Sequence, residues 1–165
     1  MAEYKPKYGT ATAFTITLTS VASSSTKVAG RSSAVVDNTT TRYDDALVSG
    51  YIKANNTAPT AGSLDVWVWA KHMDDTYPDT ITGSDADITL TSADIRNAGL
   101  RLATTIVTDT TANRVYHVAP FSVAALFGGV MPLKWGVFVA HVMVQALNVT
   151  SGHALYYTGI TYESV

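Results

Sequence analysis

Hydrophobic and polar residues alternate with a period of two along much of this chain. In the segment 64–71, Leu-Asp-Val-Trp-Val-Trp-Ala-Lys, Val66 and Val68 fall on one face of an extended strand, and Trp67 and Trp69 fall on the other. A strand with aliphatic side chains on one side and two indoles on the other has no ordinary solvent face. One face must fill a core, and the other must meet a second layer, a ligand or another subunit.

The same alternation, or a β-branched run between turn clusters, predicts strands at residues 13–19, 46–54, 64–71, 100–107, 114–121, 135–146 and 154–162. Weaker runs predict a short strand within residues 28–36, with Gly30 as a bulge, and another at residues 88–90. Ser122 can cap one helical turn that ends before Gly128. No longer amphipathic helix is visible.

About eight evenly spaced strands without a substantial helix are typical of an all-β fold, an antiparallel β-sandwich of the jelly-roll type. The alternation predicts a set of buried core residues, Phe14, Ile16, Val66, Val68, Val137 and Val139. We expect one sandwich domain over residues 11–165, preceded by an extended arm over residues 1–10. The arm contains a proline and the sequence Tyr4-Lys5-Pro6-Lys7-Tyr8, so we expect it to become ordered only against a partner.

Composition narrows the choice of partner. Charged residues make up 15% of the chain, below the usual value of about 25%, which suits a surface partly covered by neighbours. The net charge of −2 offers no field for a phosphate backbone, so we expect no nucleic-acid partner. The first residues contain no apolar run and no segment is long enough to span a bilayer, so we expect neither a secretory signal nor a membrane partner. The absence of cysteine fits folding in a reducing cytoplasm.

Catalytic and metal-binding patterns are weak. The dispersed histidines, His72, His117, His141 and His153, form no recognised ligand spacing, and His141 lies in an apolar strand, where we expect a hydrogen-bonded core residue. The polar segment 71–94 carries aspartates that match no EF-hand loop, namely Asp74, Asp75, Asp79, Asp85 and Asp87. We interpret this segment as a solvated loop in which aspartates cap turns, with a Ca²⁺ site as the alternative.

No arrangement of residues indicates an enzyme. Asp44 and Asp45 are adjacent, so in an extended segment they point to opposite faces and cannot flank one glycosidic bond. The chain has no Gly-X-Ser-X-Gly sequence, and Gly128-Gly129 precede no phosphate-binding helix. We therefore expect no catalytic residues, no metal and no cofactor.

The aromatic residues remain, and they can serve as core, as subunit interface or as a stacking platform for sugars. Because Val66 and Val68 already claim one side of their strand, we expect Trp67 and Trp69 to lie outside the core. Together with the arm and a tyrosine pair near the C-terminal end, this gives the predicted interface residues: Tyr4, Lys5, Lys7, Tyr8, Trp67, Trp69, Tyr156 and Tyr157.

Several segments resemble the decoration, or cement, proteins of tailed bacteriophage capsids. They are Ala-Gly-Arg-Ser-Ser-Ala-Val-Val-Asp-Asn-Thr at residues 29–39, Asp-Ala-Leu-Val-Ser-Gly at 45–50, Ala-Pro-Phe-Ser-Val at 119–123, and Phe-Gly-Gly-Val-Met-Pro-Leu-Lys-Trp-Gly at 127–136. The resemblance implies a jelly roll of two four-stranded sheets without enzymatic activity. It also implies a homo-oligomer, a dimer or trimer, bound to the major capsid protein on the virion surface after folding in the host cytoplasm.

The sequence therefore predicts a structural virion protein that stabilises a shell by bridging capsid subunits, and repeated weak contacts would supply the avidity. The alternative is a carbohydrate-binding or receptor-binding sandwich of a phage tail or head fibre, with tryptophans or tyrosines as its platform. A hydrolase would require carboxylates that converge in a pocket.

Overall fold

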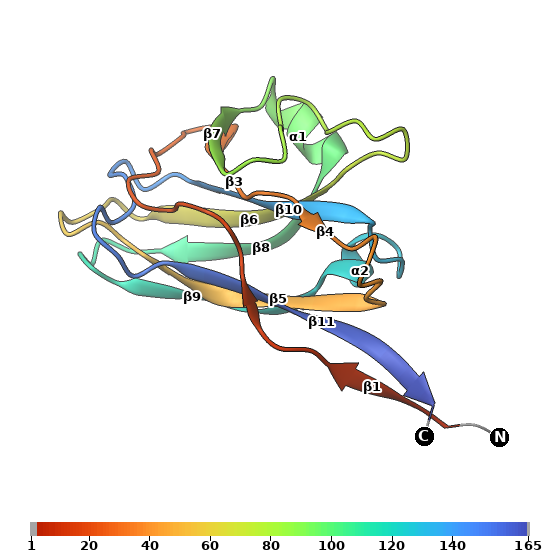
Figure 1. Ribbon diagram of the computed structural model, residues 1–165. Helices are drawn as coiled ribbons and strands as arrows, with labels where there is room; N and C mark the ends of the chain where they lie inside the picture. Colours follow the sequence, from red (N-terminus) through yellow and green to blue (C-terminus); the bar gives the residue numbers. More distant parts are fainter. Residues whose placement is uncertain (1–2, 165) are drawn as a thin grey trace.

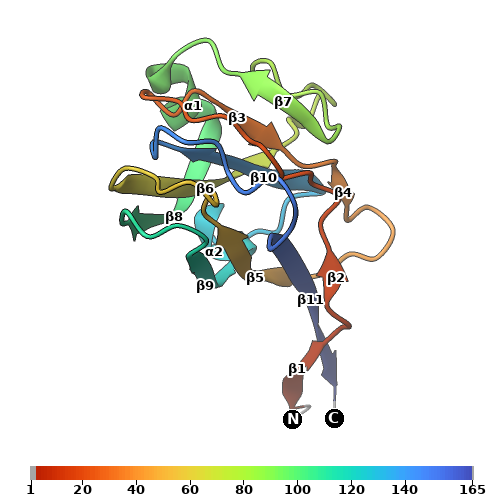
Figure 2. The ribbon, with the colours of Figure 1, turned by 90° about the vertical axis from the view of Figure 1, so that its left-hand side faces the viewer.

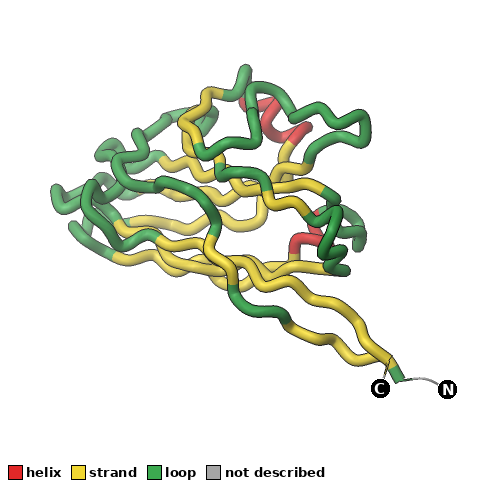
Figure 3. The backbone as a smooth tube through the Cα atoms, viewed as in Figure 1, coloured by secondary structure: helices red, strands yellow, loops and turns green. Residues whose placement is uncertain are grey.

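The computed structural model describes residues 3–164, and strands predominate in it (Figure 3). The elements in chain order are β1 (Tyr4–Tyr8), β2 (Thr12–Ala13), β3 (Ala29–Ser32), β4 (Val36–Asp37), β5 (Asp45–Lys53), β6 (Gly62–Ala70), β7 (Ala86–Thr89), α1 (Ala93–Gly99), β8 (Leu100–Thr108), β9 (Val115–Ser122), α2 (Val123–Leu126), β10 (Lys134–His141) and β11 (Ala154–Ser164). The prediction of an all-β fold is confirmed.

The strands form two antiparallel sheets that face each other (Figure 1). Sheet A has the order β1-β11-β5-β9, and β2 also pairs with β11. Sheet B has the order β7-β3-β10-β6-β8, and β4 also pairs with β10. In sheet B the long strands β6 and β10 lie side by side, with Val68 opposite Val137 and Val66 opposite Val139. This register brings the aliphatic faces of both strands to the same side of the sheet.

The main core lies between the two sheets. Val66, Val68, Val137 and Val139 are fully buried there, as predicted, and they belong to one cluster with residues of sheet A such as Val48. A second set of predicted core residues behaves less uniformly. Phe14 is buried, with its ring 5.5 Å from that of Trp135 in an edge-on arrangement, whereas Ile16 is only partly buried against the cluster.

A second core covers the opposite face of sheet B, and it corrects the prediction that Trp67 and Trp69 lie outside the core. Trp69 is 0% exposed and Trp67 is 6% exposed. The chain itself covers them, because the segment that contains edge strand β7 and its flanking loops folds back over this face (Figure 1) and supplies apolar side chains, including Ile81, Ile88 and Leu90. The indoles therefore meet a second layer of the same chain, which makes them unavailable to a partner.

Aromatic contacts and hydrogen bonds hold this layer against the sheet. The Trp69 ring, whose indole N–H donates to the carbonyl oxygen of Val137 within sheet B at 3.3 Å, lies 5.8 Å from the ring of Tyr77 in the covering segment. The guanidinium of Arg96, on α1, lies 4.6 Å from the ring centre of Trp67 and donates to the carbonyl oxygens of Thr26 and Lys27. A cation over an indole face is a favourable pair. The layer is thus packed and hydrogen-bonded.

Helix α1 was not predicted, because its seven residues are too few to show a helical period. Its local signal is the cap: the Ser92 hydroxyl accepts from the backbone N–H of Ile95 at 3.2 Å. The predicted turn at α2 is confirmed, with the Ser122 hydroxyl accepting from the N–H of Ala125 at 3.0 Å.

Other strand boundaries differ from the prediction. The strand predicted at residues 13–19 is short, because β2 covers only Thr12–Ala13. The strand predicted at residues 135–146 ends earlier, at His141, and the chain then forms a loop in which Val144 has a φ of 63°. Gly30 is not a bulge: it pairs regularly with Ile88, and a Cβ at this position would overlap the carbonyl oxygen of Val139 and the ring of Phe138. Glycine is needed there for close packing.

Candidate interaction surface

Residues 4–8 do not form a free arm. They make strand β1, which pairs in regular antiparallel register with residues 160–164 of β11. This two-stranded segment, which we call the ribbon, projects from one end of the body (Figure 1), and its strands run side by side to the tip (Figure 2). The expectation that the arm has order only against a partner is therefore corrected.

The ribbon leaves the body because the sequence of β11 changes on its inner face. Leu155 and Tyr157 point inward and pack against the main core. The next inward positions beyond Gly159 are Thr161 and Glu163, whose polar side chains cannot extend the hydrophobic core. At this point the strand continues outward with only β1 beside it.

The register gives the ribbon two unlike faces. Tyr4, Pro6 and Tyr8 lie opposite Ser164, Tyr162 and Ile160, so these side chains share one face. Lys5 and Lys7 lie on the other face, opposite Glu163 and Thr161, and the Lys7 ammonium contacts the Glu163 carboxylate at 2.9 Å. One face is aromatic and the other is charged.

Both strand edges of the ribbon are unsuited to pairing with a further strand. Gly9 donates to the carbonyl oxygen of Gly159 at 2.8 Å, which in this register turns the backbone groups of Tyr4, Pro6 and Tyr8 outward. Pro6 has no N–H to donate there. On the far edge, the carboxylate of Asp44 accepts from the N–H of Tyr162 at 3.0 Å. A partner must therefore recognise side chains rather than add a strand.

The aromatic face of the ribbon continues onto the outer face of sheet A. Alternation along β11 places Tyr156 on the same face as Tyr162, and Tyr51, opposite Ala154 on β5, shares that face. We call this surface the tyrosine face; its members are Tyr4 (68% exposed), Tyr8 (59%), Tyr51 (37%), Tyr156 (38%) and Tyr162 (58%). No other described segment lies below this sheet in Figure 1.

The predicted interface residues are thus divided. Tyr4, Tyr8 and Tyr156 lie together on the tyrosine face, and Lys5 and Lys7 lie on the opposite face of the ribbon. Tyr157 points inward instead, with its ring 5.6 Å from that of Trp135, so its predicted role at an interface is corrected. Tyr51 and Tyr162 were missed, although the alternation of Tyr156, Thr158, Ile160 and Tyr162 could have indicated the latter.

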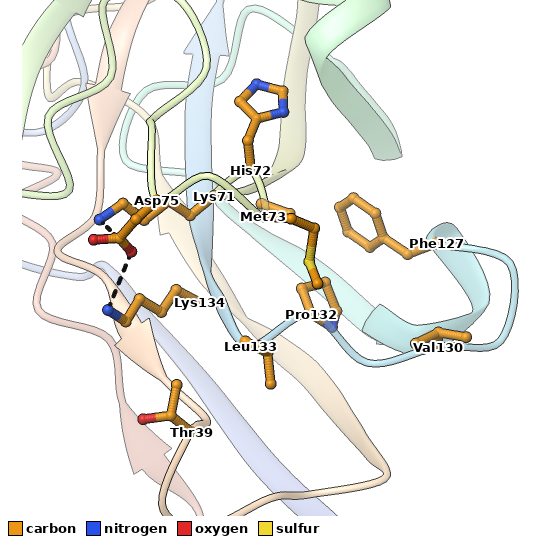
Figure 4. A pocket seen from close by; sticks show the side chains of 11 residues that line it. Thr39, Lys71, His72, Met73, Asp75, Phe127, Val130, Pro132, Leu133 and Lys134 are labelled. Atoms are coloured by element: carbon orange, nitrogen blue, oxygen red, sulfur yellow. Dashed lines mark hydrogen bonds and ion pairs between the residues drawn. The ribbon is translucent and has the colours of Figure 1, made fainter.

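A groove opens beside α2 (Figure 4). Helix α2 lies at the same end of the molecule as the ribbon (Figure 1). It encloses about 320 Å³ between residues 70–75 and 127–134. Its apolar wall consists of Met73, Phe127, Val130, Pro132 and Leu133.

Several apolar side chains of the groove are exposed: Met73 is 91% exposed, Val130 is 71% exposed and Leu133 is 52% exposed. One rim carries charge. The Asp75 carboxylate contacts the ammonium groups of Lys71 at 2.8 Å and Lys134 at 3.4 Å (Figure 4), and the hydrogen bond from Lys71 lowers the pKa of Asp75. The groove therefore combines an apolar wall with a polar rim.

Asp74 caps a turn, as interpreted from the sequence, because it accepts from the N–H and hydroxyl of Thr76, which also lowers its pKa. The interpretation of the whole segment 71–94 as a solvated loop is corrected, since Ile81, Ile88 and Leu90 are buried. Its other aspartates make longer-range contacts, and Asp79 accepts from the N–H and hydroxyl of Thr91. Asp85 is partly buried, which opposes its ionisation, but hydrogen bonds from Arg31 and Thr17 lower its pKa overall. Within residues 3–164, no three metal-ligating side chains converge.

His141 is a buried, hydrogen-bonded core residue, as predicted. Its Nε2 lies 3.0 Å from the carbonyl oxygen of Val21, and its Nδ1 accepts from the N–H of Met143 at 3.4 Å, so the neutral ring with a proton on Nε2 satisfies both contacts. Burial lowers the pKa of His141. Burial also lowers the pKa of His153, whose Nδ1 accepts from the N–H of Lys53. The imidazole rings of His141 and His153 are therefore both hydrogen-bonded to the backbone.

No protein-family model, curated protein or solved structure matches this chain. In the part of the chain that the structure describes, no helix has the length and apolar character needed to cross a membrane. The function must therefore be argued from the surface itself.

Proposed function

We propose that this chain is a structural virion protein, a jelly-roll β-sandwich that binds the outside of a tailed-bacteriophage capsid and stabilises it by bridging major capsid protein subunits. Its place is the capsid surface, after folding in the host cytoplasm, and its role requires no catalytic group or cofactor. Two facing antiparallel sheets with one core between them support the sandwich.

The tyrosine face is the observation that carries the proposal. Sheet B is covered by a second core, whereas sheet A presents exposed tyrosines along its outer face. From Tyr156 to Tyr162 alone the face extends about 20 Å, at about 3.3 Å per residue. Tyrosine is enriched in protein interfaces because its ring buries apolar area while its hydroxyl retains a hydrogen bond. A sheet with this composition suits docking onto another protein.

The members of the tyrosine face are uncharged, which suits a contact that is repeated over a shell. On the ribbon, the charged residues Lys7 and Glu163 form an ion pair on the opposite face. A moderate contact made many times, with each oligomer engaging several capsid subunits, gains avidity without one large interface. We assign the sheet tyrosines, Tyr51 and Tyr156, to the capsid contact.

A carbohydrate-binding or receptor-binding module is the second candidate, and the exposed tyrosines are the observation in its favour, because their rings can stack on sugars. Burial of Trp67 and Trp69 removes the platform that the sequence suggested for it. A glycan array separates the candidates: binding of a defined sugar that is lost in Tyr51→Ser/Tyr156→Ser would favour the second.

The test is co-sedimentation of the purified protein with expanded capsids of the cognate phage. We expect saturable binding at a fixed ratio to the major capsid protein, and at least about 30-fold weaker binding for Tyr51→Ser/Tyr156→Ser. Lys5→Ser/Lys7→Ser, on the opposite face of the ribbon, provides a surface control with unchanged binding. A wild-type protein that stays in the supernatant, or a tyrosine variant that binds normally, would contradict the proposal.

A further inference from the structure

We infer that the ribbon of one copy of this chain docks, through Tyr4, Tyr8 and Tyr162, into the groove of a second copy. The inference deepens the proposed function and rests on it for its biological role, since it supplies the oligomer that binds the shell. The contact itself is argued from the ribbon and the groove alone.

The ribbon needs a partner for its aromatic face. An isolated pair of strands is at best marginally stable in water. All five residues of β1 are exposed, and the three ribbon tyrosines are each more than half exposed. Because Pro6 and Asp44 block both edges, the contact must be made by side chains, and the aromatic face offers the apolar area that a partner can bury. The acceptor must therefore be a concave apolar surface.

The groove has the matching chemistry. A tyrosine presents an apolar ring and a hydroxyl, and the groove presents the apolar wall of Met73, Val130 and Leu133 beside the charged rim around Asp75. Methionine also makes favourable contacts with aromatic rings. Donor and acceptor lie at the same end of the molecule (Figure 1), so copies gathered around a common axis can exchange ribbons.

The size of the ribbon favours reciprocal exchange over a single contact. Five residue pairs span roughly 17 Å along strands about 5 Å apart, which gives a footprint far below the roughly 800 Å² per partner of a stable interface. In a closed dimer or ring every copy both donates a ribbon and receives one, so the buried area per copy doubles. A closed assembly is thus the expected form.

The test compares complementary variants by size-exclusion chromatography with light scattering. Tyr8→Ser/Tyr162→Ser disables the ribbon, and Val130→Glu/Leu133→Glu disables the groove; all four positions are exposed, so both variants should fold. We expect an oligomeric wild type and self-association weakened at least about 30-fold in each variant. A mixed pair retains one intact ribbon–groove contact, so the two variants should associate with each other more tightly than either associates with itself, but less tightly than wild type. Lys5→Ser/Lys7→Ser, on the charged face of the same strand, is the matched control and should assemble like wild type.

A monomeric wild type at 100 µM, assembly of either variant like wild type, or mixed variants that associate no more tightly than each variant alone would each overturn the inference. A photo-crosslinker provides an independent measurement that does not depend on lost assembly. With p-benzoylphenylalanine in place of Tyr8, we expect a crosslink between two chains at Met73, and crosslinks confined to other regions would overturn the inference. These experiments contain no capsid, so their failure is distinct from a failure of capsid binding through Tyr51 and Tyr156.

Discussion

Replacing Trp69 by alanine tests the layer that covers sheet B. The side chain is fully buried, and truncation of a buried tryptophan costs about 3–5 kcal/mol of the free energy of unfolding. Little of this comes from the indole hydrogen bond, because the carbonyl oxygen of Val137 also accepts from the N–H of Ser33 at 2.9 Å and stays satisfied. Most of the loss is packing against Ile81, Leu90 and their neighbours. For a domain of this size the expected fall in Tm is about 6–20 °C.

The measurement is guanidinium denaturation followed by far-UV circular dichroism, since removal of an indole alters the fluorescence signal. Trp69→Phe retains a ring and should lose about 1–2 kcal/mol, and the exposed control Tyr156→Ser should stay within about 0.5 kcal/mol of wild type. If the free energy of unfolding of Trp69→Ala were within about 1 kcal/mol of the wild-type value and the variant no longer assembled, the burial argument would be refuted. The Trp69 side chain would then be assigned to an interface.

Three further predictions follow from buried and paired groups. Val68→Asp places an unpaired charge in the main core and should abolish cooperative unfolding; a soluble, native-like variant by circular dichroism would contradict the assigned faces. Burial lowers the pKa of His141 in the folded state, so the unfolded chain takes up a proton first as the pH falls below about 6.5, and the free energy of unfolding should decrease with decreasing pH; His141→Gln should show a smaller decrease, and an equal decrease would contradict this. Deletion of residues 1–8 removes only exposed side chains from the described part, so Tm should change by at most a few degrees while assembly and capsid binding weaken; unchanged capsid binding would remove the ribbon from the mechanism.

Alternation predicted the fold where one face of a strand is buried and the other is distinct. Val66 and Val68 were assigned correctly to the main core because period two separates them from the indoles. The indoles were assigned wrongly because their cover comes from a distant, polar-looking segment with apolar residues such as Ile81 and Leu90 at irregular intervals. The hydrophobic pattern of a single strand cannot show which other segment packs on it in the folded chain.

The interaction surface was only partly predictable for a similar reason. The sequence predicted that the aromatic residues Tyr4, Tyr8 and Tyr156 lie at an interface. Only the register of β1 against β11 shows that they share a face with Tyr162. The groove could not be predicted at all, since Met73 and Leu133 belong to loops that meet only in the folded chain. Neither loop has a periodic pattern.

The most direct test of the central claim is electron cryomicroscopy of cognate capsids incubated with the purified protein. We predict additional density at repeated positions on the outer surface, spanning neighbouring capsid subunits, with the Tyr51 and Tyr156 face of sheet A against the shell. Capsids that remain bare at saturating protein concentration, or density that contacts the shell only through the opposite, α1-covered side, would contradict the account.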